Sequence, residues 1–255
     1  MNLRTFIVSL LDQSKRRALA TDQANKYGLE FEFFDAVDGK RLEKEVLHAH
    51  YDEARNRKYF KRPLANGEIA CYLSHIGLWE KIAHGTDDRV LILEDDFEFI
   101  VDPTPFFRQL ADKNIADVMI KIDGSPRQRK PRIVEDLGET TLSMVDIIPA
   151  RTTGYLIGRK AAERLYESRR NFFRTVDNDI KHHWEYDVPV LVAIPQLVRE
   201  RDDNKSNLDE ARNAQRSGGV LKRLLNNLLY QARFKIGLLI HPKTKIDRIR
   251  ELLSA

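Results

Sequence analysis

Wholly apolar runs alternate with amphipathic stretches along most of the chain. Leu3–Leu10 is apolar almost throughout, which predicts a strand buried on both faces of a parallel sheet. A helix is expected next, capped by Asp12 or Ser14 and ended by Gly28. Leu29–Phe34 predicts a second strand, so the chain opens with a βαβ unit.

The pattern continues beyond this unit. Residues 41–60 are charged and predict helix. A stronger helix opens at Asn66-Gly67 and ends at Gly85, because apolar residues recur in it at spacings of three and four. Further strands are expected over Arg89–Leu93, Asp117–Ile122, Thr141–Ile148, Gly154–Ile157 and Val188–Ile194, helices over Arg159–Ser168 and around Asp179–Trp184, and a basic loop over 123–140. This alternation predicts an α/β fold.

Composition narrows the class of protein. Apolar residues make up 42% of the 255, which excludes wholesale disorder. The single cysteine, Cys71, excludes an intramolecular disulfide and a cysteine-rich zinc site. The apolar run Phe6–Leu11 is too short for a signal peptide or a membrane span, so a cytoplasmic location is expected.

The net charge of +4 is unevenly distributed. Residues 211–255 hold ten Lys and Arg against two acids, a net charge of +8, and the remainder carries −4. A nucleic-acid partner is not expected, since the basic charge lies in the tail and not on the main domain. An acidic surface is the expected partner of the tail.

Three consecutive carboxylates, Glu94, Asp95 and Asp96, follow the clearest strand of the chain. Ligands of open α/β sheets bind at the carboxyl ends of strands. Adjacent acids repel one another, and oxygen ligands favour Mg²⁺ or Mn²⁺, ions that commonly hold a diphosphate. A solvated acidic turn is the alternative interpretation.

A second acidic pair, Asp177 and Asp179, is followed by His182 and His183. A capping aspartate is the simplest interpretation of the pair, and adjacent histidines are not expected to chelate one metal. The sequence has no nucleophile elbow, phosphate-binding glycine loop or dinucleotide fingerprint, which argues against serine hydrolases, P-loop enzymes and dehydrogenases.

Several segments together resemble glycosyltransferase family 25, which includes bacterial lipooligosaccharide and lipopolysaccharide β-galactosyltransferases and is related to collagen galactosyltransferases. The resemblance extends over about residues 3–200. It rests on Gly67-Glu68-Ile69-Ala70-Cys71-Tyr72-Leu73-Ser74-His75 with Trp79, Phe6–Leu10 with Arg16-Arg17, Phe33–Gly39, Leu93–Asp96, Thr153-Gly154-Tyr155 and Val176-Asp177.

This resemblance implies a GT-A type fold, a Rossmann-like mixed sheet with flanking helices, which we expect over 1–210. The charge and amphipathic pattern of residues 211–255 predict a separate basic helical tail. The resemblance also implies a UDP-sugar donor, most often UDP-galactose, and inversion at the anomeric carbon. Inversion in one step needs a carboxylate base, for which Asp177 is the first candidate and Asp179 the second. The remaining candidates are Asp96 and Glu94 for Mn²⁺ or Mg²⁺, and Ser9, Asp35, Asp38, Ser74, His75, Glu94 and Asp95 for the donor.

Two other functions stay open. A metal-dependent nucleotidyl- or phosphotransferase would also use acids after a strand, and a membrane-associated protein could bind a nucleotide sugar without catalysis. Release of pyrophosphate or of UDP distinguishes the first of these from a glycosyltransferase.

The tail has two amphipathic segments. Its apolar positions are Leu221, Leu224, Leu225, Leu228, Leu229 and Ile236, and, after Pro242, Ile246, Ile249, Leu252 and Leu253. Apolar faces flanked by Lys and Arg suit an anionic bilayer. We expect residues 218–255 to dock on the cytoplasmic face of the inner membrane, beside a lipid-linked saccharide acceptor. Packing on the catalytic domain, or on a second subunit of a homodimer, is the alternative.

Overall fold

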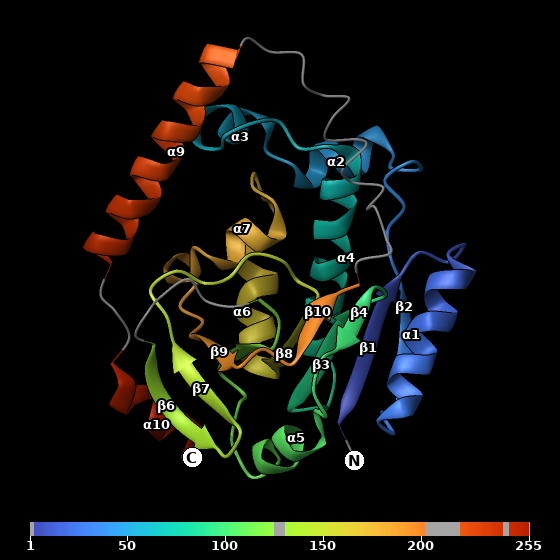
Figure 1. The fold of residues 1–255 in the computed structure, drawn as a ribbon. Coiled ribbons are helices and arrows are strands. Elements are labelled where there is room, and N and C mark those ends of the chain that lie inside the picture. The colour runs from blue at the N-terminus through green and yellow to red at the C-terminus, as the bar shows by residue number, and fades with distance from the viewer. Residues whose placement is uncertain (1–2, 125–130, 202–219, 242–244, 255) are drawn as a thin grey trace.

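The computed structural model describes residues 3–124, 131–201, 220–241 and 245–254, with the backbone alone for 220–223 (Figure 1). Its centre is a mixed sheet of order β2-β1-β3-β8-β5-β9-β7-β6. The strands are β1 (Arg4–Ser9), β2 (Glu32–Asp35), β3 (Arg89–Glu94), β5 (Met119–Lys121), β6 (Arg132–Leu137), β7 (Thr140–Met144), β8 (Gly154–Gly158) and β9 (Val190–Ile194). A small second sheet pairs β4 (Phe97–Phe99) with β10 (Val198–Glu200).

Helices cover both faces of the main sheet, as expected for an α/β fold with flanking helices. One core contains side chains of α4 (Asn66–Ala83), α6 (Arg159–Arg169), α7 (Val176–Ile180) and α9 (Val220–Ile240). The other contains side chains of α1 (Ser14–Lys26), α5 (Thr104–Leu110) and α10 (Ile246–Ser254). The short helices α2 (Lys44–His50) and α3 (Glu53–Tyr59) lie near the amino end of α4 (Figure 1).

Strand β1 is buried on both faces, as its apolar sequence predicts. Phe6 and Val8 point into the first core, and Ile7 points into the second, because successive side chains of a strand alternate. β1 pairs in parallel with both β2 and β3, and the register places Ser9 beside Asp35 and Val8 beside Glu94. The carboxyl ends of the three strands therefore meet at one edge of the sheet.

Four local expectations are corrected. The residue preceding α1 is Gln13, and neither Asp12 nor Ser14 caps it. The expected loop 123–140 contains β6, an edge strand whose sequence is half polar because one of its sides faces solvent. The short strands β4 and β10 were not predicted. The helix expected around 179–184 divides into α7 and a 3₁₀ turn over His183–Glu185.

The two tail helices differ in their environment. On α10, Ile249 and Leu253 are buried in the second core, and the backbone carbonyl of Leu253 accepts a hydrogen bond from the Asn114 amide at 3.0 Å. On α9, only one side packs on the protein, through Tyr230 and Phe234. Among the described residues, no helix combines the length and apolar character that crossing a bilayer requires. The expected domain boundary near residue 210 lies outside the described residues.

Candidate active site

The three carboxylates lie at the carboxyl end of β3. Glu94 is partly exposed, whereas Asp95 and Asp96 are buried. The Ser9 hydroxyl donates to Asp95 Oδ2 at 2.6 Å. Arg16, from the first turn of α1, places one guanidinium nitrogen 2.9 Å from Asp95 Oδ1 and 2.5 Å from Asp96 Oδ2. The positive partner that such a cluster needs is therefore supplied, within the protein itself, by an arginine.

Only one of the two carboxylate oxygens of Asp96 is paired in this arrangement. Burial raises the pKa of Asp96 to about 7, the charge of Glu94 adds to the rise, and Arg16 opposes it. The second oxygen of Asp96, Oδ1, is buried and has no hydrogen-bond partner among the described residues. A buried carboxylate oxygen without a partner, beside two further carboxylates, fits a divalent cation that prefers oxygen ligands.

Glu94 is held from the opposite side. The Thr152 hydroxyl donates to Glu94 Oε1 at 2.5 Å, and His75 Nε2 lies 3.7 Å from the same oxygen. Burial raises the pKa of Glu94, but the neighbouring His75 and Thr152 outweigh burial, and the pKa is lowered. The carboxylate is therefore charged at neutral pH and held by the Thr152 hydroxyl.

His75 is buried on α4, within a hydrogen-bond network of aromatic side chains. Its Nδ1 lies 2.8 Å from the Tyr155 hydroxyl, which also accepts a hydrogen bond from Trp79 Nε1 at 3.1 Å. This network fixes the plane of the imidazole ring next to Glu94. His75 is consequently placed to orient Glu94.

The loop after β2 is fastened to α4 and α1. Ser74 Oγ accepts a hydrogen bond from the Val37 amide at 2.9 Å and donates to the Ala70 carbonyl at 2.8 Å. Arg17 pairs with Asp35 and donates to the Ser9 carbonyl at 3.1 Å. Ser74 thus holds the loop in position, and Asp35, whose side chain is 62% exposed, lies at its margin.

Asp38 lies in the same loop. It accepts a hydrogen bond from the Lys40 amide at 2.9 Å, and Arg41 approaches it at 3.4 Å.

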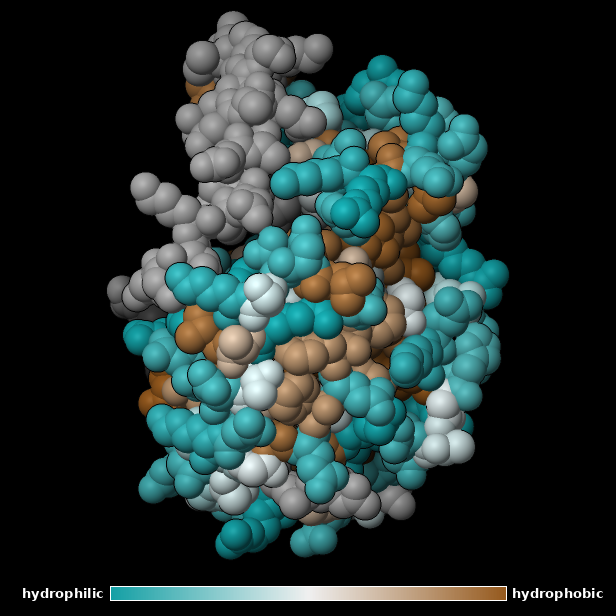
Figure 2. Space-filling view, turned by 90° about the vertical axis from the view of Figure 1, so that its right-hand side faces the viewer, coloured by the Kyte–Doolittle hydropathy of each residue, from teal (hydrophilic) through white to brown (hydrophobic). Residues whose placement is uncertain are grey.

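Figure 2 views the molecule from the side of α1 and β2, where apolar residues gather toward the middle of a hydrophilic face. Leu11 and Val37 are exposed among the residues that follow β1 and β2.

Asp177 and Asp179 have different surroundings on α7. Asp179 is buried against Arg174 at 2.6 Å and Arg169 at 3.2 Å, and it accepts a hydrogen bond from the Tyr72 hydroxyl. Burial raises the pKa of Asp179, but the two arginines outweigh burial, and the pKa is lowered. Asp179 therefore belongs to a buried ion-pair cluster.

Asp177 is partly exposed. It accepts hydrogen bonds from the Thr175 hydroxyl at 2.6 Å and from the Asn178 amide at 3.0 Å. Burial raises its pKa, but these donors and the charge of Lys181 outweigh burial and lower it. Asp177 is thus an ionised carboxylate with access to solvent.

Cys71 of α4 lies beside Glu94. Its Sγ, a ring nitrogen of His75 and a carboxylate oxygen of Glu94 all lie within 4.8 Å of one another. Burial raises the pKa of the Cys71 thiol well above the usual value, and the charges of Glu94 and Asp177 raise it further.

The two histidines that follow Asp179 lie near α9. His182 Nδ1 donates a hydrogen bond to the Asn178 carbonyl at 2.7 Å, its ring packs against Phe234, and burial lowers its pKa to about 4. Burial likewise lowers the pKa of His183 to about 4. Both rings are neutral at pH 7.

Lys121 and Asp123 were missed by the sequence analysis. They form a buried ion pair, with Nζ and Oδ1 2.7 Å apart, at the carboxyl end of β5. β5 runs in the same direction as β3, since each is antiparallel to β8, so the pair lies at the same edge as Glu94. The sequence did contain a signal for this pair. Lys121 and Asp123 are charged residues in a run, beginning at Met119, that is otherwise apolar.

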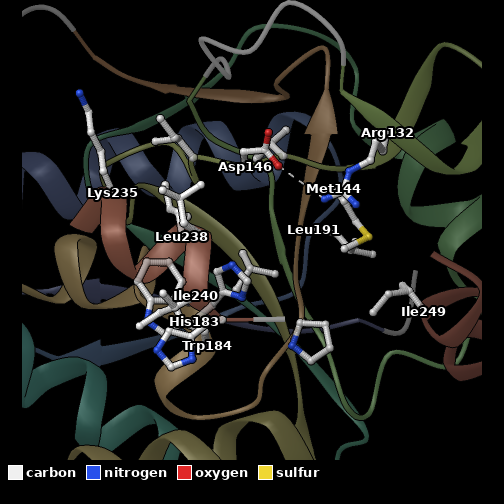
Figure 3. Close-up of a pocket in the computed structure, with 16 residues that line it drawn as sticks. Arg132, Met144, Asp146, His183, Trp184, Leu191, Lys235, Leu238, Ile240 and Ile249 are labelled. Carbon is white, nitrogen blue, oxygen red and sulfur yellow. Dashed lines mark ion pairs between the residues drawn. The ribbon is translucent and has the colours of Figure 1, made fainter. Parts of the chain in front are cut away.

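An apolar cavity lies elsewhere. It has a volume of about 710 Å³ and is lined mainly by apolar side chains of α9 and the adjoining strands, with Trp184 and Leu238 on one side and Met144 and Leu191 on the other (Figure 3). Leu191 lies near the start of β9. β9 is parallel to β5, so this end of the strand is opposite to the edge of the sheet where Glu94, Asp95 and Asp96 lie, here called the acidic edge. This cavity is therefore distinct from the candidate active site.

Comparisons with known proteins agree with these motifs. The model of the family described as glycosyltransferase family 25 (LPS biosynthesis protein) matches residues 2–180. A glycosyltransferase 25 family member of Aedes aegypti is 30% identical over 173 residues, covering 64% of this chain and 28% of that protein. Human procollagen galactosyltransferase 2 is 27% identical over 167 residues, covering 63% and 26%.

A bacterial relative is similar along more of its length. A candidate glycosyltransferase of Haemophilus influenzae is 24% identical over 236 residues, covering 87% of this chain and 82% of that protein. The chain spans about a quarter of the insect and human relatives, at 28% and 26% of their lengths. Because the family model matches well over half of the residues, including the acidic edge and Asp177, the chain belongs to glycosyltransferase family 25.

Proposed function

We propose that the protein is an inverting glycosyltransferase that transfers galactose from UDP-galactose to a lipooligosaccharide or lipopolysaccharide acceptor. The observation that carries the proposal is the group of Glu94, Asp95 and Asp96 at the carboxyl end of β3, in which Asp96 Oδ1 is buried without a hydrogen-bond partner among the described residues. One acidic group can hold a cation for the donor, and a separate, solvent-accessible carboxylate can receive a proton.

Asp96 and Glu94 are the proposed ligands of Mn²⁺ or Mg²⁺, an ion that neutralises the charge of a departing diphosphate. Asp96 offers the buried oxygen Oδ1, which has no other described partner. His75 and Thr152 orient Glu94 toward this position. Arg16 neutralises Asp95 and Asp96 in the absence of the ion and can contact the phosphates once the donor is bound.

The nucleoside of the donor is proposed to lie over the ends of β1 and β2. Asp35 and Asp38 provide carboxylates for ribose hydroxyls, and Ser9 supports Asp95 through a hydrogen bond. Ser74 holds the loop that carries these acids. Leu11 and Val37 offer exposed apolar surface to the base.

Asp177 is the proposed general base. In a single displacement, a carboxylate takes the proton of the acceptor hydroxyl while the sugar leaves the diphosphate, and the anomeric configuration inverts. The transition state resembles an oxocarbenium ion, as in glycoside hydrolysis. Asp179 is already held by two arginines, so we assign it the role of fixing α7.

Galactose is proposed as the sugar because human procollagen galactosyltransferase 2 is a relative, and a lipopolysaccharide-type acceptor because the family is described by that pathway. The test is incubation of the full chain with a panel of UDP-sugars and Mn²⁺, with and without EDTA. Release of UDP from UDP-galactose, abolished by EDTA and by Asp96→Ala, is the expected result.

Two further outcomes separate the alternatives. A nucleotidyltransferase would instead release pyrophosphate when the protein is given UTP and a sugar 1-phosphate in place of the UDP-sugars. Binding of UDP and Mn²⁺ without any release would identify a non-catalytic nucleotide-sugar-binding protein.

A further inference from the structure

Helix α9 packs on the protein along one side. Tyr230 and Phe234 are buried, with their rings 5.3 Å from Phe60 and 5.6 Å from Trp184, respectively. A Cβ at Gly237 would lie 2.8 Å from the Trp184 ring, so the helix approaches closely there. This side of α9 is fully occupied by contacts.

The opposite side of α9 is apolar and exposed. Five of its side chains are more than half exposed: Leu224 at 56%, Leu225 at 55%, Leu228 at 66%, Ile236 at 54% and Leu239 at 84%. At about 100° per residue, all five lie within roughly 60° of the direction opposite Tyr230. They form a stripe, here named the leucine face, about 22 Å long at a rise of about 1.5 Å per residue, and between Leu228 and Ile236 the same side carries Ala232 and Lys235.

The surroundings of the leucine face are basic. Between residues 224 and 240, α9 carries Arg233 and Lys235 and no acid. Arg233 donates to the Lys58 carbonyl of α3 at 2.6 Å, which brings the exposed Lys58 alongside, while Arg57 of that helix is paired with Glu53 at 3.4 Å. The two acids of residues 211–255, Asp247 and Glu251, both lie on α10.

We infer that α9 docks the protein on an anionic lipid bilayer, with the leucine face in the interface and the basic residues beside the headgroups. An apolar stripe of this length on a soluble helix marks an interaction surface, and basic flanks select an anionic bilayer. A second copy of the chain fits less well, since its own leucine face would bring a second set of basic residues against the first.

The two helices of the tail have different roles, which the sequence did not distinguish. Ile249 and Leu253 of α10 are core residues, so α9 alone provides the docking surface. The Tyr230 hydroxyl donates to Asn178 Oδ1 at 3.2 Å, and Asn178 in turn contacts Asp177. The docked helix is thus held in a fixed position relative to the proposed base, which suits an acceptor carried by a lipid.

The test uses the full chain and sedimentation with vesicles of phosphatidylcholine, with and without phosphatidylglycerol. Wild-type protein is expected to sediment with the anionic vesicles and to be released by high salt. The triple variant Leu224→Gln, Leu228→Gln, Leu239→Gln is expected to bind at least tenfold more weakly. Arg233→Gln with Lys235→Gln is expected to weaken binding severalfold.

A matched control replaces three exposed apolar residues outside α9. The variant Ile100→Gln, Val101→Gln, Ile133→Gln is expected to sediment like wild type, because these side chains are exposed on other elements. UDP release without vesicles is expected to be unchanged in both triple variants. Failure of docking can therefore be told apart from failure of the proposed transfer reaction.

Two outcomes would overturn the inference. One is equal binding of wild type and the leucine-face variant to anionic vesicles, or no binding by either. The other is a dimer of the wild-type chain in light scattering that becomes a monomer in the leucine-face variant, which would assign the face to a second copy.

Discussion

Asp177 and Asp179 lie two positions apart on one helix, yet their environments assign them different tasks. Asp179 faces the interior, where Arg169, Arg174 and Tyr72 surround it. Asp177 is partly exposed and accepts hydrogen bonds from the Thr175 hydroxyl and the Asn178 side-chain amide. Side chains two positions apart on a helix point in different directions. Spacing in the sequence could not separate the two roles, because it does not show which of these directions is toward the interior.

Asp177→Asn is expected to retain donor binding and lose turnover by about 10²-fold or more, since the amide cannot accept the proton. Steady-state kinetics together with UDP titration calorimetry measures both quantities. Turnover close to that of wild type would remove Asp177 from the mechanism.

Asp179→Asn is expected to lower the free energy of unfolding by about 3 kcal/mol or more, because it leaves Arg169 and Arg174 buried without their partner. Urea denaturation is the measurement. If this variant instead keeps wild-type stability and loses turnover, the base is Asp179.

Asp96 predicts a pH dependence of stability in EDTA. Its pKa in the folded protein is raised to about 7, against an ordinary value of 3.8. Between these values the folded state binds more protons than the unfolded state, so this contribution to stability is present at pH 4 and is lost as the pH rises through 7. Asp96→Asn is therefore expected to be more stable than wild type at pH 8 and equally stable near pH 4, as measured by thermal unfolding. A constant difference at all pH values would contradict this assignment.

At the scale of elements, the loop after β2 is in close contact with the start of α4. This contact fixes the position of the loop beside the carboxyl ends of β1 and β3. A Cβ added at Gly39 would lie 2.8 Å from the backbone of Asn66 and Gly67. This distance is shorter than real contacts of Cβ atoms, and the neighbouring atoms are backbone, which cannot turn aside. Glycine at position 39 thus allows the loop to lie where Ser74 can hold it.

Gly39→Ala is expected to displace this loop and to raise KM for the donor about tenfold, equivalent to ~1.4 kcal/mol of binding free energy. The turnover number should change much less, because Asp177 lies on another element. Gly28→Asn serves as a control, since Gly28 has a positive φ of +63° that asparagine tolerates and open space around it. An unchanged KM in Gly39→Ala would show that the loop does not contact the donor.

At the scale of the whole molecule, helix α10 is packed into the main fold. α10 contacts β6, and the Arg250 side chain donates to the Val134 carbonyl at 3.0 Å. The structure therefore favours packing for α10, whereas α9 keeps an exposed apolar side. A truncation that removes both helices would expose part of the second core and could not test membrane docking alone.

Ile249→Ala and Leu253→Ala are each expected to lower the free energy of unfolding by about 2–4 kcal/mol, because each leaves a cavity in the second core. Leu239→Ala, at a position 84% exposed, is expected to have almost no effect. Urea denaturation of the three variants makes the comparison, and similar losses in all three would contradict the different placement of α9 and α10.

The sequence by itself determined the elements whose pattern is strong and local. The apolar run of β1, the three-and-four spacing of α4 and the run leading into Glu94 predicted buried elements at nearly their observed bounds. The short family motifs likewise identified the family, because they depend on residue order alone. Weakly apolar segments, such as β6 and β10, were missed because at least half of their residues are exposed or only partly buried.

The tertiary structure decided which residues act together. The pairing of Arg16 with Asp95 and Asp96 joins residues 79 and 80 positions apart, and the contact of Tyr72 with Asp179 joins residues 107 apart. It also decided which half of the tail is core and which carries an open face. These outcomes depend on which surfaces remain available after the sheet and its helices have packed, and no local pattern of residues records that.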